Sequence, residues 1–293
     1  MLPEDVTAKI KAIEIAASKL VSSQLAGHYH SIFKGSGMTF SEVRPYWAGD
    51  DVKNIDWNVS ARMNDPYIKL FREERDRQTM LMIDMSGSGL FGTEKRTKLE
   101  TAAEVAATLA FAVNKNDDKV GLLIFTDHVE KFIPPKKGKK HVLRIVREIL
   151  TFKPESEQTD LAAGFGYLNK VSKKNTIVFC ISDFMADGWQ KNLRQLKRHH
   201  DFIPIVVQDP IEKEMPAFGW VVLEDLETKE NTVLDTFGDI SRRMKELADK
   251  RDAEREGTFS KMKIDSINIE TGTSYVDALI QFFKKRSARR LKK

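Results

Sequence analysis

The most constraining feature of this chain is a short apolar run that ends in an acid and continues with two alternating hydroxyls. Residues Thr79–Ser88 predict a buried strand that ends at Asp84, followed by a tight loop with Ser86 and Ser88. These side chains can converge on one side of the loop, and the two glycines beside the serines let the backbone come close to a bound group. Their hard oxygen atoms are typical of a site for Mg²⁺ or Mn²⁺ rather than zinc.

Two later segments favour such a site over a plain loop. Asp, Ser and Gly are also common turn formers and helix caps, so the first segment alone leaves both interpretations open. Thr159 lies in a polar stretch before the helix-like run 161–173, and Asp183 follows a second apolar strand, 176–181. The carboxyl ends of neighbouring parallel strands lie at the same edge of their sheet, and ligands of open α/β sheets bind at that edge. We therefore expect Thr159 and Asp183 to lie near the first loop.

Strand and helix patterns alternate along most of the chain. Apolar runs of strand length lie at 79–84, 120–125, 129–133, 176–181, 202–207, 220–223 and 263–267. Apolar residues at helical spacing lie at 4–25, 98–114, 141–152, 161–173, 189–200, 239–255 and 275–285. Pro134 and Pro135 end the run 129–133, which places that strand at a sheet edge. The alternation predicts an α/β fold with a doubly wound, mostly parallel sheet and helices on both faces.

The segment before this alternation differs in character. Gly27–Asp65 is rich in Gly, Asp and Trp with little periodicity, so we expect an irregular accessory segment. Its large side chains should be buried and dock it onto the sheet domain; they are Phe40, Tyr46, Trp47 and Trp57. Tyr67–Glu73 is expected to pair as a strand next to 79–84. The domains are therefore 1–77, an N-terminal helix and accessory segment, and 78–293, the sheet domain.

Charged residues of the accessory segment leave two interpretations open. They could form a charge network, or they could be solvated turn residues, since surface ion pairs contribute little. The residues are Arg44, Asp50, Asp51, Asp56 and Arg62.

Composition agrees with a cytoplasmic protein. With 293 residues, 41% of them hydrophobic, the chain can bury one large α/β domain plus an accessory segment. No apolar run reaches the roughly 18 residues of a transmembrane segment, and the start lacks the basic residues of a signal peptide. The single cysteine, Cys180, lies in an apolar strand, which predicts a buried and inert thiol.

Three catalytic classes find little support in the residues. A phosphatase of the haloacid-dehalogenase type needs a second carboxylate two positions after the first, where this chain has Ser86. A serine hydrolase needs a Gly-x-Ser-x-Gly elbow, and a P-loop needs Gly-x-x-x-x-Gly-Lys; neither occurs. A Mg-dependent hydrolase is thus the weakest hypothesis. The net charge of +5 and the basic run 282–293 suggest an alternative, a basic protein that binds nucleic acid or an anionic surface. The run is also typical of a solvated helix end.

The three loops together resemble a known metal site. Asp84, Ser86, Ser88, Thr159 and Asp183 resemble, in order and spacing, the metal-ion-dependent adhesion site of von Willebrand factor A domains. The resemblance implies that the hydroxyls of Ser86, Ser88 and Thr159 contact the metal, while the two aspartates act largely through bound water. It also implies an open coordination position that a partner's carboxylate fills.

Residues upstream narrow the resemblance. Gly35–Trp57, Ser60–Arg62 and Tyr67–Arg75 resemble the signature of the bacterial domain-of-unknown-function family fifty-eight, which places a von Willebrand factor A-like domain behind it. The family often has Met where this chain has Gly89, a departure that leaves the ligands untouched. The resemblance implies a non-enzymatic, metal-dependent protein-interaction module that acts as an adaptor or chaperone-like partner of a MoxR-type AAA+ ATPase.

Overall fold

The structure is a computed structural model. It describes residues 4–20, 29, 38–73, 77–92, 96–173, 175–213, 216, 218–224, 226, 229–237 and 239–291. The chain divides into two compact units, Phe33–Arg77 and a larger unit of Met1–Ile32 with Gln78–Lys293. The helix α1 (Glu4–Leu20), which the sequence placed with the accessory segment, thus belongs with the sheet domain.

A six-stranded sheet forms the centre of the larger unit, and it confirms the predicted fold class. Its order is β10-β7-β6-β3-β4-β5, and each neighbouring pair is parallel except β4 with β5. The strands are β3 (Gln78–Asp84), β4 (Lys119–Phe125), β5 (Val129–Lys136), β6 (Ile177–Ser182), β7 (Asp201–Gln208) and β10 (Ile267–Glu270). The inner strands are continuous apolar runs because helices cover both of their faces.

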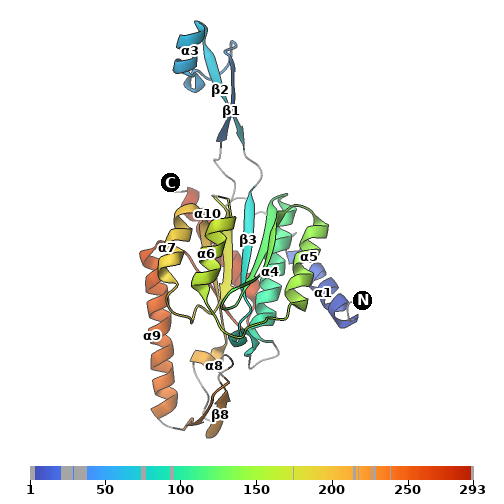
Figure 1. Cartoon of the computed structure of the whole chain (residues 1–293), viewed down its shortest axis with the longest axis vertical. Coiled ribbons are helices and arrows are strands. Elements are labelled where there is room, and N and C mark those ends of the chain that lie inside the picture. The colour runs from blue at the N-terminus through green and yellow to red at the C-terminus, as the bar shows by residue number, and fades with distance from the viewer. Residues whose placement is uncertain are drawn as a thin grey trace. The chain divides into compact units, whose positions relative to one another are not determined.

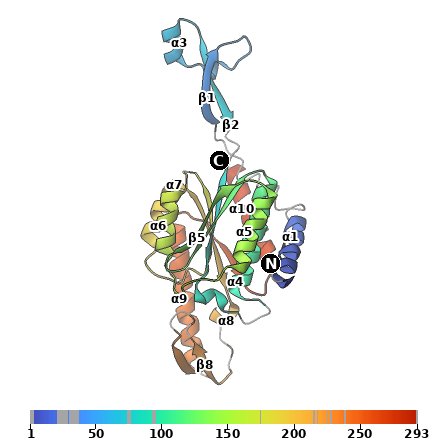
Figure 2. The same cartoon turned by 45° about the vertical axis from the view of Figure 1, so that its right-hand side comes forward.

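Helices lie on both sides of this sheet (Figures 1 and 2). On one side α4 packs with α1 and α5, and on the other α6 packs with α7. The Ala-rich helix α4 is almost wholly buried, and a capping box of Thr97 and Glu100 fixes its start. The helices of this unit are α4 (Lys98–Lys115), α5 (Lys139–Thr151), α6 (Leu161–Val171), α7 (Gln190–His199), α8 (Pro210–Lys213), α9 (Asp239–Lys261) and α10 (Tyr275–Leu291).

Several boundaries differ from the sequence expectation. β5 is the predicted edge strand, but it continues through Pro134 and Pro135 to Lys136. The strand expected at 263–267 begins only at Ile267, because α9 runs on to Lys261. A hairpin of β8 (Trp220–Glu224) and β9 (Asn231–Asp235) adds a strand that we did not predict. The thiol of Cys180 is fully buried, as expected, and burial raises its pKa well above the usual range.

The unit Phe33–Arg77 is more regular than its composition suggests. β1 (Met38–Pro45) pairs antiparallel with β2 (Tyr67–Glu73), so the expectation that β2 lies next to β3 is wrong. Between the two strands lie a 3-10 turn η2 (Val52–Asn54), capped by Asp51, and the helix α3 (Trp57–Met63), capped by Asp56. The guanidinium of Arg44 donates to both carboxylate oxygens of Asp50, each at 2.8 Å.

The large side chains of this unit are not the buried anchors that we expected. Trp47 is 70% exposed and Trp57 is 69% exposed. Tyr46 is half-buried, and the side chain of Phe40 lies outside the described part of the chain. The prediction of buried docking residues is therefore wrong for both tryptophans.

Candidate functional site

The carboxyl edge of the sheet brings four of the five predicted residues together. Asp84 ends β3, Asp183 follows β6, and the serines lie in and beside the 3-10 turn η3 (Gly87–Leu90). Asp84, Ser86, Ser88 and Asp183 line one cavity of about 20 Å³, which is room for about one water-sized group. The predicted convergence of the two strand ends is thus observed for these residues.

Asp84 is buried, and the groups that donate hydrogen bonds to its carboxylate are uncharged. Its Oδ1 accepts a hydrogen bond from the backbone N–H of Ser86 at 3.0 Å, and its Oδ2 accepts one from the hydroxyl of Ser182 at 2.7 Å. Burial first, and then the nearby charge of Asp183, raise the pKa of Asp84 to about 6. A carboxylate held in this way gains from any cation that enters the cavity.

The hydroxyls of the two serines contact each other at the edge of the cavity. Their Oγ atoms lie 3.1 Å apart in a hydrogen bond that either can donate. Ser86 stands at the N-cap position of η3, yet its side chain makes no capping hydrogen bond. Gly87 between them is required by close contact, because a Cβ there would lie 2.6 Å from the carbonyl oxygen of Leu226.

Thr159 is the one predicted residue that does not line the cavity. It is half-buried, and its loop is tied to the site because the N–H of Gly87 donates to the carbonyl of Glu157 at 2.8 Å. The next residue, Asp160, caps α6 through the N–H groups of Ala162 and Ala163. The loop therefore lies next to the serines. Thr159 lies between Glu157, which contacts Gly87, and Asp160, which caps α6.

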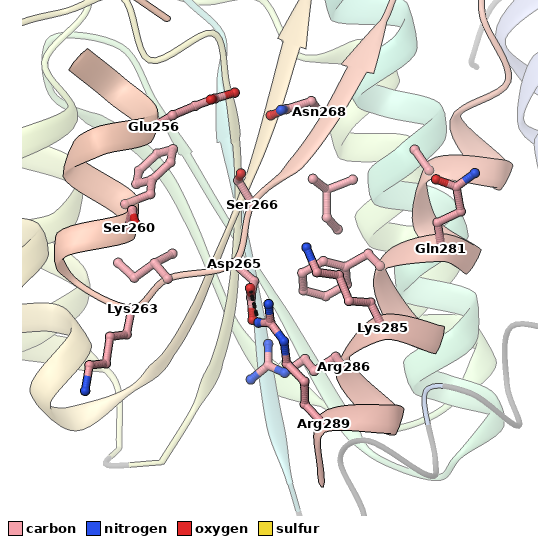
Figure 3. A pocket seen from close by; sticks show the side chains of 15 residues that line it. Glu256, Ser260, Lys263, Asp265, Ser266, Asn268, Gln281, Lys285, Arg286 and Arg289 are labelled. Carbon is pink, nitrogen blue, oxygen red and sulfur yellow. Dashed lines mark hydrogen bonds and ion pairs between the residues drawn. The ribbon is translucent and has the colours of Figure 1, made fainter. Parts of the chain in front are cut away.

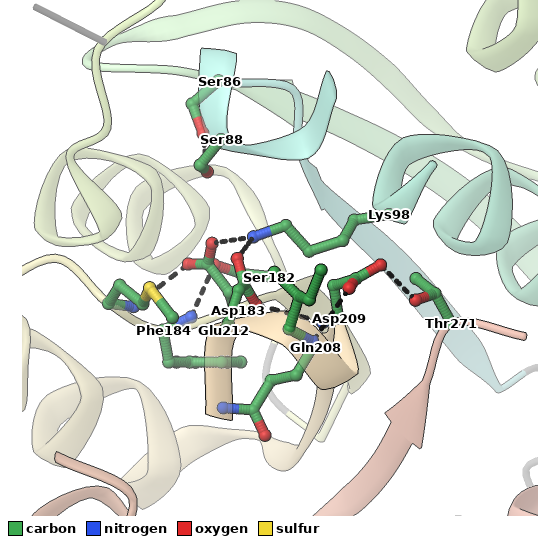
Figure 4. A network of polar contacts seen from close by, with 12 residues as sticks. Ser86, Ser88, Lys98, Ser182, Asp183, Phe184, Gln208, Asp209, Glu212 and Thr271 are labelled. Carbon is green, nitrogen blue, oxygen red and sulfur yellow. Dashed lines mark hydrogen bonds and ion pairs between the residues drawn. The ribbon is translucent and has the colours of Figure 1, made fainter. Parts of the chain in front are cut away.

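Lys98 is a site residue that the sequence reasoning missed. It is only 4% exposed and lines the same cavity from the first turn of α4. Its ammonium donates to Asp183 Oδ2 at 2.9 Å and to Glu212 Oε1 at 2.6 Å, as Figure 4 shows. Burial lowers the pKa of Lys98, but the charges of Asp183 and Glu212 outweigh burial and the net shift is upward.

The sequence contained a signal that could have identified Lys98 as a residue of the site. Thr97 and Glu100 have the spacing of a capping box, which predicts a helix start after β3, at the carboxyl edge of the sheet. A positive charge in the first turn of a helix is destabilised by the helix dipole, so a lysine at this position indicates an anionic partner nearby. The partner itself could not be predicted, since Glu212 lies far away in the sequence.

A second layer of polar contacts supports the ion pairs. Glu212 lies in α8, and its Oε2 accepts from the backbone N–H of Asp209 at 3.0 Å. Arg255 of α9 is buried, pairs with Asp252 at 2.8 Å and donates to the backbone carbonyl of Asp183 at 3.3 Å. These contacts hold Asp183 and Glu212 in place around the ammonium.

The donor set fits a small hard cation. Two carboxylates and two hydroxyls border a cavity of suitable size, and the hydroxyl oxygens already approach each other. Among the described residues, no group of three or more His, Cys, Asp or Glu is placed to hold a metal ion, so a cation here would depend on the serine hydroxyls as well as on the two acids. Lys98 neutralises Asp183 from one side, which leaves Asp84 and the serines as the group with the greatest need for a cation.

Fold and site together define an α/β protein with an oxygen-rich polar cluster at the carboxyl edge of its sheet. The chain belongs to the family described as "Protein of unknown function DUF58", whose model matches residues 42–256. An uncharacterized protein of Mycobacterium tuberculosis is 30% identical over 224 residues, which are 75% of this chain and 71% of the relative. An uncharacterized protein of Mycobacterium avium is 24% identical over 157 residues, 53% of this chain and 93% of the relative.

Solved structures that this chain resembles include those of BatB and of the SpRpn10 VWA domain. The conserved hypothetical protein BatB from Bacteroides thetaiotaomicron has a TM-score of 0.47 and 13% identity, covering 72% of this chain and 99% of that chain. The SpRpn10 VWA domain has a TM-score of 0.39 and 15% identity, covering 70% of this chain and 93% of that chain. In the described part of this chain, no helix is long and apolar enough to cross a membrane.

Proposed function

We propose that this chain is a non-enzymatic protein-interaction module whose carboxyl edge binds Mg²⁺ or Mn²⁺. Asp84, Ser86, Ser88, Thr159 and Asp183 would hold the ion, and a carboxylate of a protein partner would complete its coordination. The observation that supports this proposal is the convergence of two acids and two hydroxyls on one small cavity. The bound ion would supply a positive charge that an acidic side chain of the partner recognises.

The candidate partner comes from the resemblance of the sequence alone. That resemblance suggests a MoxR-type AAA+ ATPase, for which this module would act as an adaptor or chaperone-like partner in the cytoplasm.

Metal binding can be tested with matched variants. We expect Mg²⁺ and Mn²⁺ to raise the melting temperature of the wild type, because a ligand that binds only the folded state stabilises it. Asp84→Asn and Ser88→Ala should abolish this gain. Asp117→Asn, at an exposed loop, and Ser172→Ala, at a buried hydroxyl without a hydrogen bond, should keep it. Equal responses from all five proteins would show that the cluster consists of turn residues only.

Partner binding requires a separate measurement. Purified MoxR-type ATPase should be retained by the immobilised wild type in Mg²⁺ and released by a chelator, and Asp84→Asn should not retain it. Retention that is the same with the chelator and with Asp84→Asn would contradict a metal-bridged contact.

A further inference from the structure

The edge strand β10 is open on the side that faces away from β7. β10 is the last strand of the six-stranded sheet, and the N–H of Thr271 donates to the carbonyl of Gln208 on β7 at 2.9 Å. In a parallel ladder, alternate residues turn both main-chain groups towards the same neighbour. Because residue 271 faces β7, residues 267 and 269 do so as well. The main-chain groups of Asn268 and Glu270 therefore point away from β7. The carbonyl of Glu270 already accepts hydrogen bonds from the N–H of Thr273 at 3.2 Å and from its hydroxyl at 2.7 Å, which leaves the N–H and carbonyl of Asn268 and the N–H of Glu270 for an added strand.

The two edges of this sheet are protected to different degrees. Natural edge strands are blocked by proline, lysine, bulges or a very short length, and β10, with four residues, has only the last of these. β5 has Pro134, Pro135 and two lysines, and its register with β4 is interrupted twice. β10 has the sequence Ile-Asn-Ile-Glu, and an unbroken register with β7. This contrast within one sheet indicates an edge that is kept available for a further strand.

Two helices turn this edge into the floor of a trough. α9 and α10 stand on either side of β10 and enclose a groove of about 620 Å³ (Figure 3). Glu256 and Ser260 line it from α9, and Gln281 and Lys285 line it from α10. Ile267 and Phe282 also line the groove, although they are only 2% and 7% exposed. The groove thus combines available main-chain groups of β10 with polar walls, which an extended peptide can use.

The charge of the groove selects the kind of peptide. Lys285 is exposed, reaches from α10 towards β10, and forms no ion pair within the described part of the chain. Arg289 and Arg286 add positive charge beside it, where they pair with Asp265 and Asp201 at 2.5 Å. Asp265 is thereby neutralised, so Glu256 is the only acid of the lining outside these pairs.

We propose that the trough between α9 and α10 binds an extended, acidic peptide segment of a partner protein, which adds to β10 as a further strand. The main chain of the peptide would pair with the N–H and carbonyl of Asn268 and with the N–H of Glu270, and its acidic side chains would lie beside Lys285. The basic residues lie where β7 and β10 begin, at the opposite end of the strands from Asp84 and Asp183. Binding here is therefore separate from the candidate metal site and persists in a chelator.

Fluorescence anisotropy with a labelled octapeptide of alternating Val and Glu tests this proposal. The whole chain should bind it, and the matching peptide of Val and Lys should bind about tenfold more weakly. Lys285→Glu should weaken binding of the acidic peptide by a similar factor, since an attraction becomes a repulsion. Lys284→Glu is the matched control, one residue away on the same helix and outside the groove, and should bind within about twofold of the wild type.

Amide hydrogen exchange distinguishes strand addition from a purely electrostatic contact. Bound acidic peptide should slow the exchange of the Asn268 and Glu270 amides and leave the already paired amide of Thr271 unchanged. The proposal is overturned if the peptide does not bind, if the Lys285 variant binds equally well, or if those two amides stay unprotected. It is also overturned if single-stranded DNA displaces the peptide and itself binds without protecting them, since the groove would then be a nucleic-acid site.

Discussion

Replacing Lys98 by methionine removes the ammonium that donates to the carboxylates of both Asp183 and Glu212. Methionine has a similar length and no charge, so the cavity stays filled while two carboxylates lose their partner. The side chains of Lys98 and Asp183 are 4% and 6% exposed, and that of Glu212 is 16% exposed. Water therefore cannot replace the ammonium at Asp183. Removing one partner of a buried ion pair costs about 3–5 kcal/mol, and we expect a loss of unfolding free energy in this range at neutral pH without metal.

One feature of the loss identifies its cause. The cost should shrink when Glu212→Gln is added, because one of the two unpaired charges is then absent. A double-mutant cycle measures this coupling.

The same substitution should increase the affinity of the site for Mg²⁺, although it lowers the stability of the metal-free protein. The ammonium repels a divalent ion in the same cavity, so its removal should tighten binding by about tenfold to a hundredfold. Mg²⁺ should then restore part of the lost stability, since it supplies positive charge to Asp183.

The assay is urea unfolding in a chelator and in excess Mg²⁺, with calorimetric titration for affinity. Lys115→Met is the control, because Lys115 is exposed in the last turn of the same helix. It should cost about 1 kcal/mol or less and leave Mg²⁺ affinity unchanged. If Lys98→Met behaves like this control in both measurements, Lys98 is not the internal counter-charge of the site and the reasoning fails.

Three further outcomes are expected. Trp57→Ala should change the unfolding free energy by about 0.5 kcal/mol or less in urea, because Trp57 is 69% exposed, whereas Trp189→Ala, at a residue 2% exposed, should cost about 3–5 kcal/mol. Arg286→Ala should lower stability by about 1 kcal/mol or less through its pair with Asp201, and Lys284→Ala should leave it unchanged; equal effects would refute a role for this pair. Without metal, the stability that protonated Asp84 contributes should be present near pH 4 and lost as the pH rises through about 6, so Asp84→Asn should gain about 3 kcal/mol relative to the wild type by pH 7; a pH-independent difference would contradict the raised pKa.

The sheet could be predicted because its strands are signalled locally. β3, β4, β6 and β7 are short apolar runs, and each is long enough to be distinguished from a loop by composition alone. β1 was missed because its partner β2 lies beyond η2 and α3, and nothing in the local pattern announces a long-range antiparallel pair.

The errors at the C-terminal elements have a different origin. The apolar spacing predicted that α9 would stop at Arg255, and Gly257, two residues further on, is a poor helix former. The helix continues to Lys261 because Phe259 is buried in the core and the space beside Gly257 is open. β10 is correspondingly shifted, since the turn at Lys263, with a φ of 53°, separates it from the helix. Tertiary burial here overrides the local signal.

At the site, the residues could be predicted from the sequence, but their contact partners could not. Asp84, Ser86, Ser88 and Asp183 could be predicted because strand ends of a parallel sheet meet at one edge. What could not be predicted is that the two acids differ. Asp183 contacts an ammonium, whereas the hydrogen bonds to Asp84 come from uncharged groups, namely serine hydroxyls and a backbone amide. At the proposed metal site a proton and a divalent cation would therefore compete first for Asp84. The hydroxyl of Ser86 would favour the cation, because its hydrogen bond lowers the pKa of Asp84 and its oxygen can coordinate a metal ion.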